Sequence, residues 1–308
     1  MLSVILPAFN EEAAVPLALA RISAVLAEAH IENELIFIDD GSSDDTWAEI
    51  QKAADARSGV TGIRFSRNFG KEAAIFAGLE AARGDCCAVM DCDLQHPPEK
   101  LPEMFRLWQE GYEVIEGVKE ERGSESASHR AAANTFYALI CKLTKLDMAS
   151  SSDFKLLDRK VVDALNAMPE RNTFFRALSY WAGFQTVKLP YQVAERAAGK
   201  SKWSTRSLIR YAVTNIISFS SAPLHLVTIL GALLLVIAVI FGAISLYQKI
   251  AGIALGGFTT VILLQLLTGS VTMISLGIIG IYIAKIYEET KGRPRYLIAE
   301  TRRSEKSE

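Results

Sequence analysis

Hydrophobic and polar positions alternate along the first 195 residues between short apolar runs and longer stretches with helical spacing. The apolar runs that resemble buried strands are residues 2–6, 34–38, 61–65 and 86–90. The stretches with helical spacing between them are residues 12–29, 44–57 and 71–83. Strands that alternate with helices predict an α/β domain with a mainly parallel sheet covered on both faces.

Two later segments, 225–246 and 258–284, contain no Asp, Glu, Lys or Arg. Each is long enough to cross a bilayer as a helix, which takes about 20 apolar residues. Lysines and arginines gather before the first segment and after the second, whereas the loop between them carries only Lys249. Because such residues concentrate on the cytoplasmic side, we expect two transmembrane helices with both termini in the cytoplasm.

The stretch 203–221, just before the first apolar segment, has an amphipathic pattern. Ile209 and Val213 belong to an apolar stripe at helical spacing, and Arg206 and Arg210 lie one turn apart on another face. This pattern favours a helix lying in the membrane interface, with its arginines toward lipid phosphates. A soluble amphipathic helix packed on the α/β domain would show the same pattern.

Every predicted strand ends at polar or acidic residues, and open α/β sheets bind ligands at that edge. The candidate residues for such a crevice are Asn10, Glu11, Asp39, Asp40, Asp91 and Asp93. Polar loop ends are common, so any single loop could also be a plain surface loop. No G-x-G-x-x-G or G-x-x-x-x-G-K-[ST] motif occurs, which predicts phosphates held through a divalent metal. The net charge of −2 gives no basic field for nucleic acid.

The stretch MDCDLQHPPE (90–99) is the candidate metal site. In a chain that stays extended, alternate residues share a face, which places Cys92 opposite the polar side chains. The predicted ligands are Asp91, Asp93 and Gln95. Their oxygens suit Mg²⁺ or Mn²⁺, with a substrate diphosphate completing the shell. Cys92 is predicted to be a small buried residue, and the sequence indicates no role for His96.

These motifs resemble family 2 glycosyltransferases of the polyprenyl-phosphate branch, which contains dolichol-phosphate mannose synthases and bactoprenol-phosphate glucosyltransferases. The matching stretches are VILPAFNEE (4–12), IDDGSSDDT (38–46), SRNFGKEAAIFAGLEAARGD (66–85), MDCDLQHPPE (90–99), SSDFKLLDR (151–159) and GKSKW (199–203). The resemblance implies a GT-A domain over 1–195 and an acceptor clamp with an interface helix over 196–221. Two transmembrane helices over 222–288 and a cytoplasmic tail over 289–308 complete the expected organisation.

The resemblance also assigns residues. It implies that the nucleotide is contacted by Pro7, Asn10, Glu11 or Glu12, Asp39, Asp40 and Asp91. It implies a catalytic set of Asp93, Asp153, Arg122 and Arg130, with the metal on Asp91, Asp93 and Gln95. It implies an acceptor-phosphate site of Arg130, Asn134, Arg196, Ser201 and Lys202. For Asp153 a structural ion pair with Lys155 or Arg159 stays open, and the unusual stretch 117–130 leaves the register of Arg122 open.

The expected reaction is transfer of a sugar, with inversion, from a nucleotide diphosphate sugar to a polyprenyl phosphate. We expect a UDP-sugar as donor, undecaprenyl phosphate as acceptor and Mg²⁺ or Mn²⁺ as cofactor. We expect the reaction at the cytoplasmic face of a bacterial plasma membrane. The product would be a lipid-linked monosaccharide used to modify cell-envelope glycans. The alternatives are a glycan synthase with another acceptor and a membrane-anchored scaffold with an inactive domain. Small residues in the spans, such as Gly269 and Gly277, would permit a homo-oligomer, for which the family suggests a tetramer.

Overall fold

The computed structural model describes residues 1–119, 152–168, 170, 174–192, 222–252 and 257–304. The chain forms two compact units, one of Met1–Ser204 with Pro294–Glu308 and one of Thr205–Arg293. Several predictions fall outside the described residues: the interface helix over 203–221 and the roles of Arg122, Arg130, Asn134, Arg196, Ser201 and Lys202. These stay predictions.

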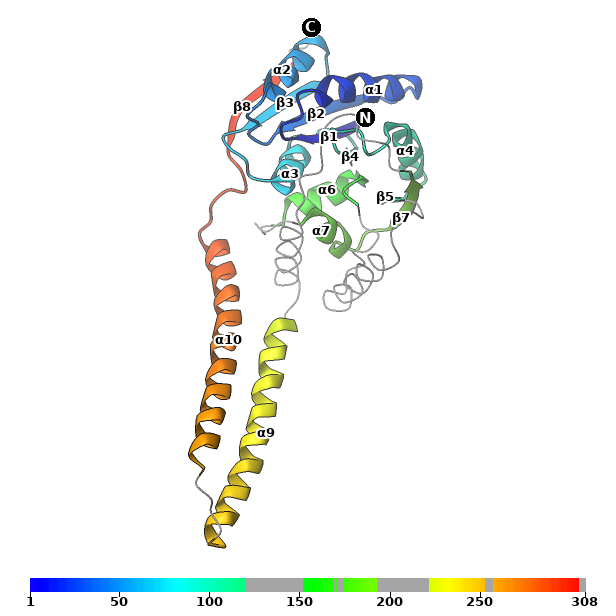
Figure 1. The fold of residues 1–308 in the computed structure, drawn as a ribbon. Helices are drawn as coiled ribbons and strands as arrows, with labels where there is room; N and C mark the ends of the chain where they lie inside the picture. The colour runs from blue at the N-terminus through cyan, green and yellow to red at the C-terminus, as the bar shows by residue number, and fades with distance from the viewer. Residues whose placement is uncertain (120–151, 169, 171–173, 193–221, 253–256, 305–308) are drawn as a thin grey trace. The chain divides into compact units, whose positions relative to one another are not determined.

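The first unit is built on one twisted sheet (Figure 1). Its described strands follow the order β7-β5-β6-β4-β1-β2-β3-β8. Their bounds are β1 (Leu2–Ala8), β2 (Asn33–Asp39), β3 (Val60–Phe65), β4 (Cys86–Val89), β5 (Val114–Lys119), β6 (Lys155–Asp158), β7 (Thr186–Tyr191) and β8 (Ile298–Arg303). The four central strands β4, β1, β2 and β3 pair in parallel, as does β5 with β7. β6 and β8 pair antiparallel with their neighbours, so the predicted α/β fold with a mainly parallel sheet is confirmed.

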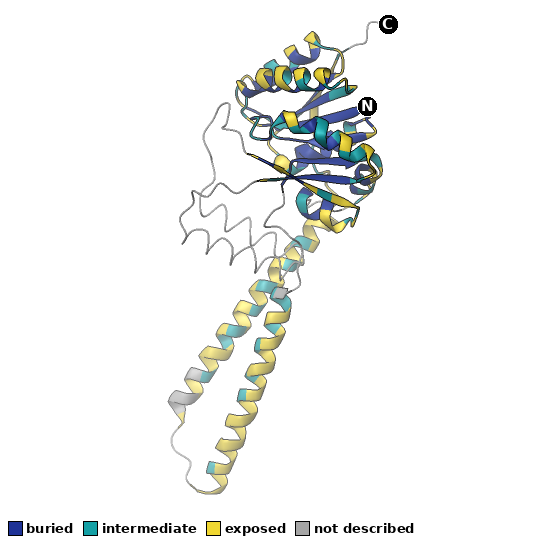
Figure 2. Ribbon diagram, turned by 90° about the vertical axis from the view of Figure 1, so that its right-hand side faces the viewer, coloured by how far each residue is buried: buried dark blue, intermediate teal, exposed yellow. Residues whose placement is uncertain are grey.

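Helices cover both faces of this sheet (Figures 1 and 2). Their bounds are α1 (Ala14–Glu28), α2 (Thr46–Ala56), α3 (Lys71–Ala81), η1 (Pro98–Lys100), α4 (Leu101–Gln109), α6 (Arg159–Asn166) and α7 (Phe175–Trp181). The three helices predicted from spacing appear as α1, α2 and α3, each shorter than its predicted range.

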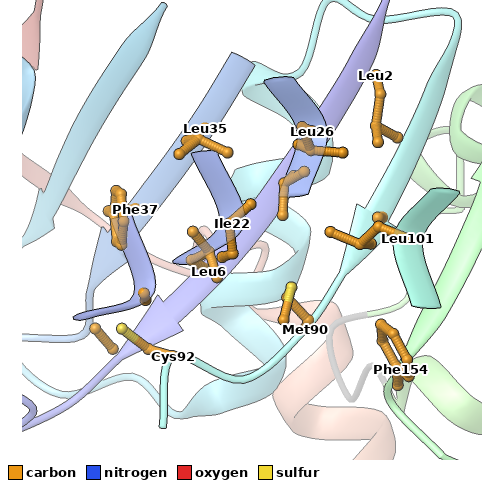
Figure 3. Close-up of a cluster of buried hydrophobic side chains, with 14 of the residues drawn as sticks. Leu2, Leu6, Ile22, Leu26, Leu35, Phe37, Met90, Cys92, Leu101 and Phe154 are labelled. Carbon is orange, nitrogen blue, oxygen red and sulfur yellow. The ribbon is translucent and has the colours of Figure 1, made fainter. Parts of the chain in front are cut away.

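Strand alternation divides the core between these two layers. Leu6 of β1 packs in one cluster with Ile22 and Leu26 of α1, as Figure 3 shows. The next residue toward the N-terminus, Ile5, faces α3 on the other side, where a Cβ added to Gly78 would meet its side chain at 2.2 Å. Glycine at this position therefore lets α3 lie directly on the sheet.

The second unit contains two long apolar helices, α9 (Ala222–Ile250) and α10 (Phe258–Thr290). The segments Pro223–Ile250 and Leu264–Thr290 are long and apolar enough to cross a membrane, and neither is buried inside the protein (Figure 2). A long apolar surface of this kind needs a nonaqueous environment. The two predicted membrane segments are thus candidate spans, and α10 continues about one and a half turns beyond its predicted end.

The chain after α10 returns to the first unit and adds the edge strand β8, which pairs antiparallel with β3. Glu300 of β8 accepts hydrogen bonds from Trp47 Nε1 (3.1 Å) and Gln51 Nε2 (2.9 Å) of α2. Just before the strand, the ring of Tyr296 stacks on Phe65 with 4.9 Å between ring centroids. This segment was predicted as a cytoplasmic tail, and the strand within it was not predicted.

Candidate active site

The loops that follow β1 and β2 are tied to each other at the carboxyl edge of the sheet. Asn10 Oδ1 accepts a hydrogen bond from the backbone N–H of Ser43 (2.9 Å), and the Asn10 N–H donates to Ser42 Oγ (2.9 Å). The Glu11 N–H donates to Thr46 Oγ1 (2.8 Å). Asn10 has a left-handed backbone with φ 56°, which asparagine tolerates better than most residues. These bonds place two of the predicted nucleotide-contacting residues, Asn10 and Glu11, on one hydrogen-bonded pair of loops.

The two aspartates that end β2 have different surroundings, although both are buried. Asp39 Oδ1 accepts from the Ser42 N–H (2.9 Å), and Arg64 Nε lies 3.3 Å from Asp39 Oδ2. Among the described residues no group donates a hydrogen bond to this Oδ2 atom. A buried carboxylate oxygen normally has such a donor, so Asp39 is the better of the two candidates for contact with a ligand. Pro7 lies beside it in the sheet, paired with Ile38.

Asp40 instead holds the chain that leads into α3. Its carboxylate accepts hydrogen bonds from the backbone N–H groups of Phe69 (2.6 Å) and Gly70 (2.9 Å). Burial raises the pKa of Asp40, and these two backbone donors oppose that rise. The next residue, Gly41, has φ 69°, and a Cβ there would lie 2.5 Å from the backbone of Arg67. Asp40 and Gly41 therefore fix where α3 begins.

The predicted metal-binding stretch does not continue as a strand. β4 ends at Val89 and the chain turns at residues 92 and 93, with Leu94 in a left-handed conformation (φ 59°). The assumption of an extended path beyond Met90 was therefore wrong, and strand alternation does not decide which side chains share a face. Within the turn, Asp93 Oδ1 accepts a hydrogen bond from the backbone N–H of Gln95 (3.1 Å).

Cys92 is buried among apolar side chains, which confirms the prediction made for it (Figure 3). Only 2% of the residue is exposed. Burial raises the pKa of its thiol, so the sulfur stays protonated and is a poor metal ligand. The carboxylates on either side of it are thus the groups left for cation binding in this turn.

His96, for which the sequence indicated no role, supports Asp91. Its Nδ1 accepts a hydrogen bond from the Asp91 backbone N–H (3.0 Å). Its ring stacks on Phe154 at 5.0 Å between centroids and meets Tyr191 edge-on at 5.8 Å. Burial lowers the pKa of His96, which keeps the ring neutral and leaves Nδ1 as an acceptor. The histidine thus fixes the backbone at the point where the chain leaves β4.

Asp91 and Asp153 meet at a single ammonium group. Lys71 Nζ lies 2.6 Å from Asp91 Oδ1 and 2.7 Å from Asp153 Oδ2. On its other side Asp153 binds Arg176 in a bidentate pair, with Nε 2.6 Å from Oδ1 and a terminal nitrogen 2.8 Å from Oδ2. Burial alone would raise the pKa of the Asp153 carboxyl, but Lys71 and Arg176 hold that pKa well below its usual range. Asp153 is therefore ionised near neutral pH in this site.

The two structural partners considered for Asp153 are engaged elsewhere. Lys155 Nζ pairs with Glu116 Oε1 at 2.9 Å in the protein interior. The guanidinium of Arg159 donates from Nε to the backbone carbonyl of Gly84 (2.9 Å). Asp153 is thus held by Lys71 and Arg176, two partners that were not predicted from the sequence.

Lys71 and Arg176 are the main site residues that sequence reasoning missed. Lys71 is the first residue of α3, and the positive end of the helix dipole disfavours a cation there. A residue that breaks a local rule often serves a site, so this position carried a usable signal. Arg176 gave a weaker one, as an isolated cation within the apolar run FFRALSYW. Glu72, next to Lys71, accepts a hydrogen bond from the Phe175 N–H (2.7 Å) and links α3 to α7.

Comparison with known proteins identifies the family of this chain. Residues 3–165 match the model of the family described as Glycosyl transferase family 2. The chain is also 40% identical over 303 residues to the Bacillus subtilis protein CsbB, covering 97% of this chain and 92% of that one. The chain belongs to glycosyl transferase family 2. It is therefore a glycosyltransferase. It is also 36% identical over 299 residues to the bactoprenol glucosyl transferase of Shigella phage SfX, and the alignment covers 96% of this chain and 98% of that one.

Among solved structures, the glycosyltransferase domain resembles glucosyl-3-phosphoglycerate synthase of Mycobacterium tuberculosis. One crystal structure of that enzyme, in complex with Mn²⁺, UDP and phosphoglyceric acid, aligns with a TM-score of 0.53 and 21% identity. The alignment covers 71% of this chain and 78% of the other. At this identity the likeness concerns the fold, and it confirms the predicted GT-A architecture.

Proposed function

We propose that this glycosyltransferase moves a sugar from a nucleotide diphosphate sugar directly onto the phosphate of a polyprenyl phosphate. The observation that carries the proposal is the single ammonium of Lys71 that contacts both Asp91 and Asp153. Asp91 belongs to the predicted donor site and Asp153 to the predicted acceptor site. Because both carboxylates contact one nitrogen, a donor and an acceptor bound at these sites would lie side by side, and the sugar could pass directly from one to the other.

The donor we propose is a UDP-sugar bound along the loops after β1 and β2. Asp39, whose Oδ2 accepts no hydrogen bond from the described residues, is suited to accept one from the nucleotide base. Asn10 and Glu11 would line the same crevice. Relatives such as that of Shigella phage SfX are named bactoprenol glucosyl transferase, so UDP-glucose is the first donor to test.

A divalent cation fits the turn after β4 by donor chemistry. Asp91, Asp93 and Gln95 offer carboxylate and amide oxygens, the ligands of Mg²⁺ and Mn²⁺, and the sulfur between them is turned into the core. The described residues contain no group of three or more His, Cys, Asp or Glu side chains that could hold a metal. The substrate diphosphate would therefore complete the shell. Such a cation would offset the charge that develops on the leaving diphosphate.

The acceptor needs little help from a base. The second pKa of a phosphate monoester is ~6, so much of it is already a dianion near neutral pH. In the proposed reaction a phosphate oxygen forms the new bond to the anomeric carbon, and the nucleoside diphosphate leaves with the electrons of the broken bond. A single displacement of this kind inverts the anomeric centre. Asp153, an anion held by two cations, positions groups in this step and takes up no proton.

We propose that the α/β domain and both termini lie on the cytoplasmic face of a bacterial plasma membrane. The segment before α9 and the segment after α10 both join the first unit, the latter through β8. If α9 crosses the membrane, α10 must cross back for β8 to pair with β3. Lysine and arginine around the outer ends of the two helices support the cytoplasmic side.

The test is a donor and acceptor screen with the purified full chain in detergent. Radiolabelled UDP-glucose and other nucleotide sugars would be supplied with undecaprenyl phosphate and Mg²⁺ or Mn²⁺, and the label followed into the lipid phase. We expect transfer that depends on the lipid phosphate. No transfer with any nucleotide sugar would refute the proposal in favour of a scaffold, and transfer to a sugar hydroxyl instead would favour a glycan synthase.

A further inference from the structure

We propose that Lys71 and Arg176 bind the phosphate of the lipid acceptor, with Asp153 as the positioning residue that fixes both side chains. This inference rests on the function proposed above and adds two binding residues to it. Two cations from different helices, Lys71 of α3 and Arg176 of α7, converge on one buried carboxylate.

The most exposed side chains of this cluster are the two cations. Those of Lys71 and Arg176 are 40% and 35% exposed, whereas Asp153 is 5% exposed and Asp91, the second partner of Lys71, is 29% exposed. An incoming group therefore meets the ammonium and the guanidinium before it can reach the Asp153 carboxylate. A surface of this kind attracts an anion, and the phosphate is the anionic part of the proposed acceptor.

Asp153 sets the direction of both cations. Its bidentate pair with Arg176 fixes the plane of the guanidinium, because two parallel N–H bonds leave little rotation. A lysine ammonium has three N–H donors, and Lys71 contacts one carboxylate oxygen each of Asp91 and Asp153, so the third donor is left to meet a ligand. Rigid cations lose less entropy when they bind a ligand, so this fixation favours phosphate binding.

The two helices that carry the cations are joined next to the site. Glu72 follows Lys71 in α3, Phe175 precedes Arg176 in α7, and the Glu72 carboxylate accepts the Phe175 N–H at 2.7 Å. The link through Asp153 and the link through Glu72 thus hold α3 and α7 at two adjacent points. The spacing between Lys71 and Arg176 is therefore a fixed property of the fold, as a site for one small anion requires.

The position of the cluster matches the reaction. Lys71 also contacts Asp91, which lies in the proposed donor site, so a phosphate bound to Lys71 would lie beside the bound sugar nucleotide. An oxygen of that phosphate is the attacking atom in the proposed displacement. The same ammonium would then hold the nucleophile close to the anomeric carbon.

The experiment measures binding rather than turnover. A short prenyl phosphate and the matching prenol, which lacks the phosphate, would be titrated into the full chain in detergent by calorimetry. The variants are Lys71→Met and Arg176→Met, with Lys160→Met as the matched control. Lys160 pairs with Glu113 at 2.6 Å on the exposed surface, outside the site.

We expect the wild type and the control to prefer the phosphate, and each site variant to lose about tenfold or more of its affinity for it. Affinity for the prenol should not change in either variant, and affinity for UDP should not change in Arg176→Met, because Arg176 pairs with Asp153 on the acceptor side. Unchanged affinity for the prenyl phosphate in both site variants would overturn the inference. An equal loss of affinity for the prenyl phosphate and the prenol would also overturn it, because that result indicates a deformed site. Lys71→Arg keeps the charge and is expected to bind the prenyl phosphate more tightly than Lys71→Met. Tighter binding by Lys71→Met than by Lys71→Arg would likewise overturn the inference. A wild type that binds phosphate and prenol alike would instead refute the proposed function itself.

Discussion

A buried ion pair beneath the site gives a prediction whose size can be worked out. Lys155 Nζ lies 2.9 Å from Glu116 Oε1 and donates to Ser179 Oγ at 2.9 Å. The two charged side chains are only 3% and 7% exposed. Glu116 also accepts the backbone N–H of Ser152 (3.2 Å), directly before Asp153. The Lys155→Met substitution leaves the Glu116 charge in the interior without its cation.

Removing one partner of a buried ion pair costs ~3–5 kcal/mol of unfolding free energy, because the other charge stays desolvated. For a domain of this size each 1 kcal/mol shifts the melting temperature by about 2–4 °C. The expected loss for Lys155→Met is therefore about 6–20 °C. Adding Glu116→Gln removes the stranded charge and keeps an oxygen for the Ser152 N–H. The double variant should regain most of the loss.

The assay is thermal unfolding of the full chain in detergent, followed by circular dichroism. The matched control is Lys160→Met, which breaks the solvent-screened pair with Glu113 and should leave the melting temperature nearly unchanged. A Lys155→Met protein that melts like the wild type would refute the reasoning about the buried charge. A double variant as unstable as the single one would refute it equally, since the loss would then come from packing.

Further predictions concern the turn after β4, α3 and β8. Asp93→Asn should abolish transfer in a folded protein, and an active variant with unchanged metal dependence would contradict the metal assignment. Cys92→Ser should leave metal affinity in isothermal titration unchanged, at a cost of ~1 kcal/mol of stability. Burial and the charge of Asp153 raise the pKa of Glu72 to about 7 from its ordinary value of 4.5. The contribution of this carboxyl group to the free energy of unfolding is therefore fully present below pH 4.5 and is lost as the pH rises through 7. Glu72→Gln should remove that fall from melting curves recorded between these pH values, and a fall that persists in the variant would contradict the assignment. Deleting residues 294–308 should lower the melting temperature by uncovering Phe65, and an unchanged melt would show that β8 adds no stability.

Elements with strong local patterns could be predicted from the sequence. The central strands β1, β2 and β4 are mostly apolar because helices cover both faces of the sheet, and the two candidate spans are uncharged over more than 20 residues. The motifs MDCDLQHPPE and SSDFKLLDR were sufficient to predict Asp91 and Asp153 as site residues. Their shared contact with Lys71 was not predictable, because it joins residues 82 positions apart through the pairing of β4 with β6.

Other features escaped prediction for physical reasons that particular residues show. β8 contains the charged sequence ETRR and is exposed along its whole length, so it lacks the alternation that marks a strand. Leu94 adopts a left-handed backbone that leucine rarely takes, and this hides the turn that follows Asp91. The hydrogen bond between the Asp91 N–H and His96 depends on that turn, which is why His96 had no role until the turn was seen.

The direct displacement proposed around Lys71 fixes the stereochemistry of the product. The decisive measurement is the anomeric configuration of the lipid-linked sugar formed from UDP-glucose, whose glucose is α-linked, read from the coupling of the anomeric proton in the NMR spectrum. A β-linked glucosyl phosphate, with a large coupling between axial protons, is the predicted result. An α-linked product would contradict a single displacement in which Asp91 and Asp153 bring donor and acceptor together.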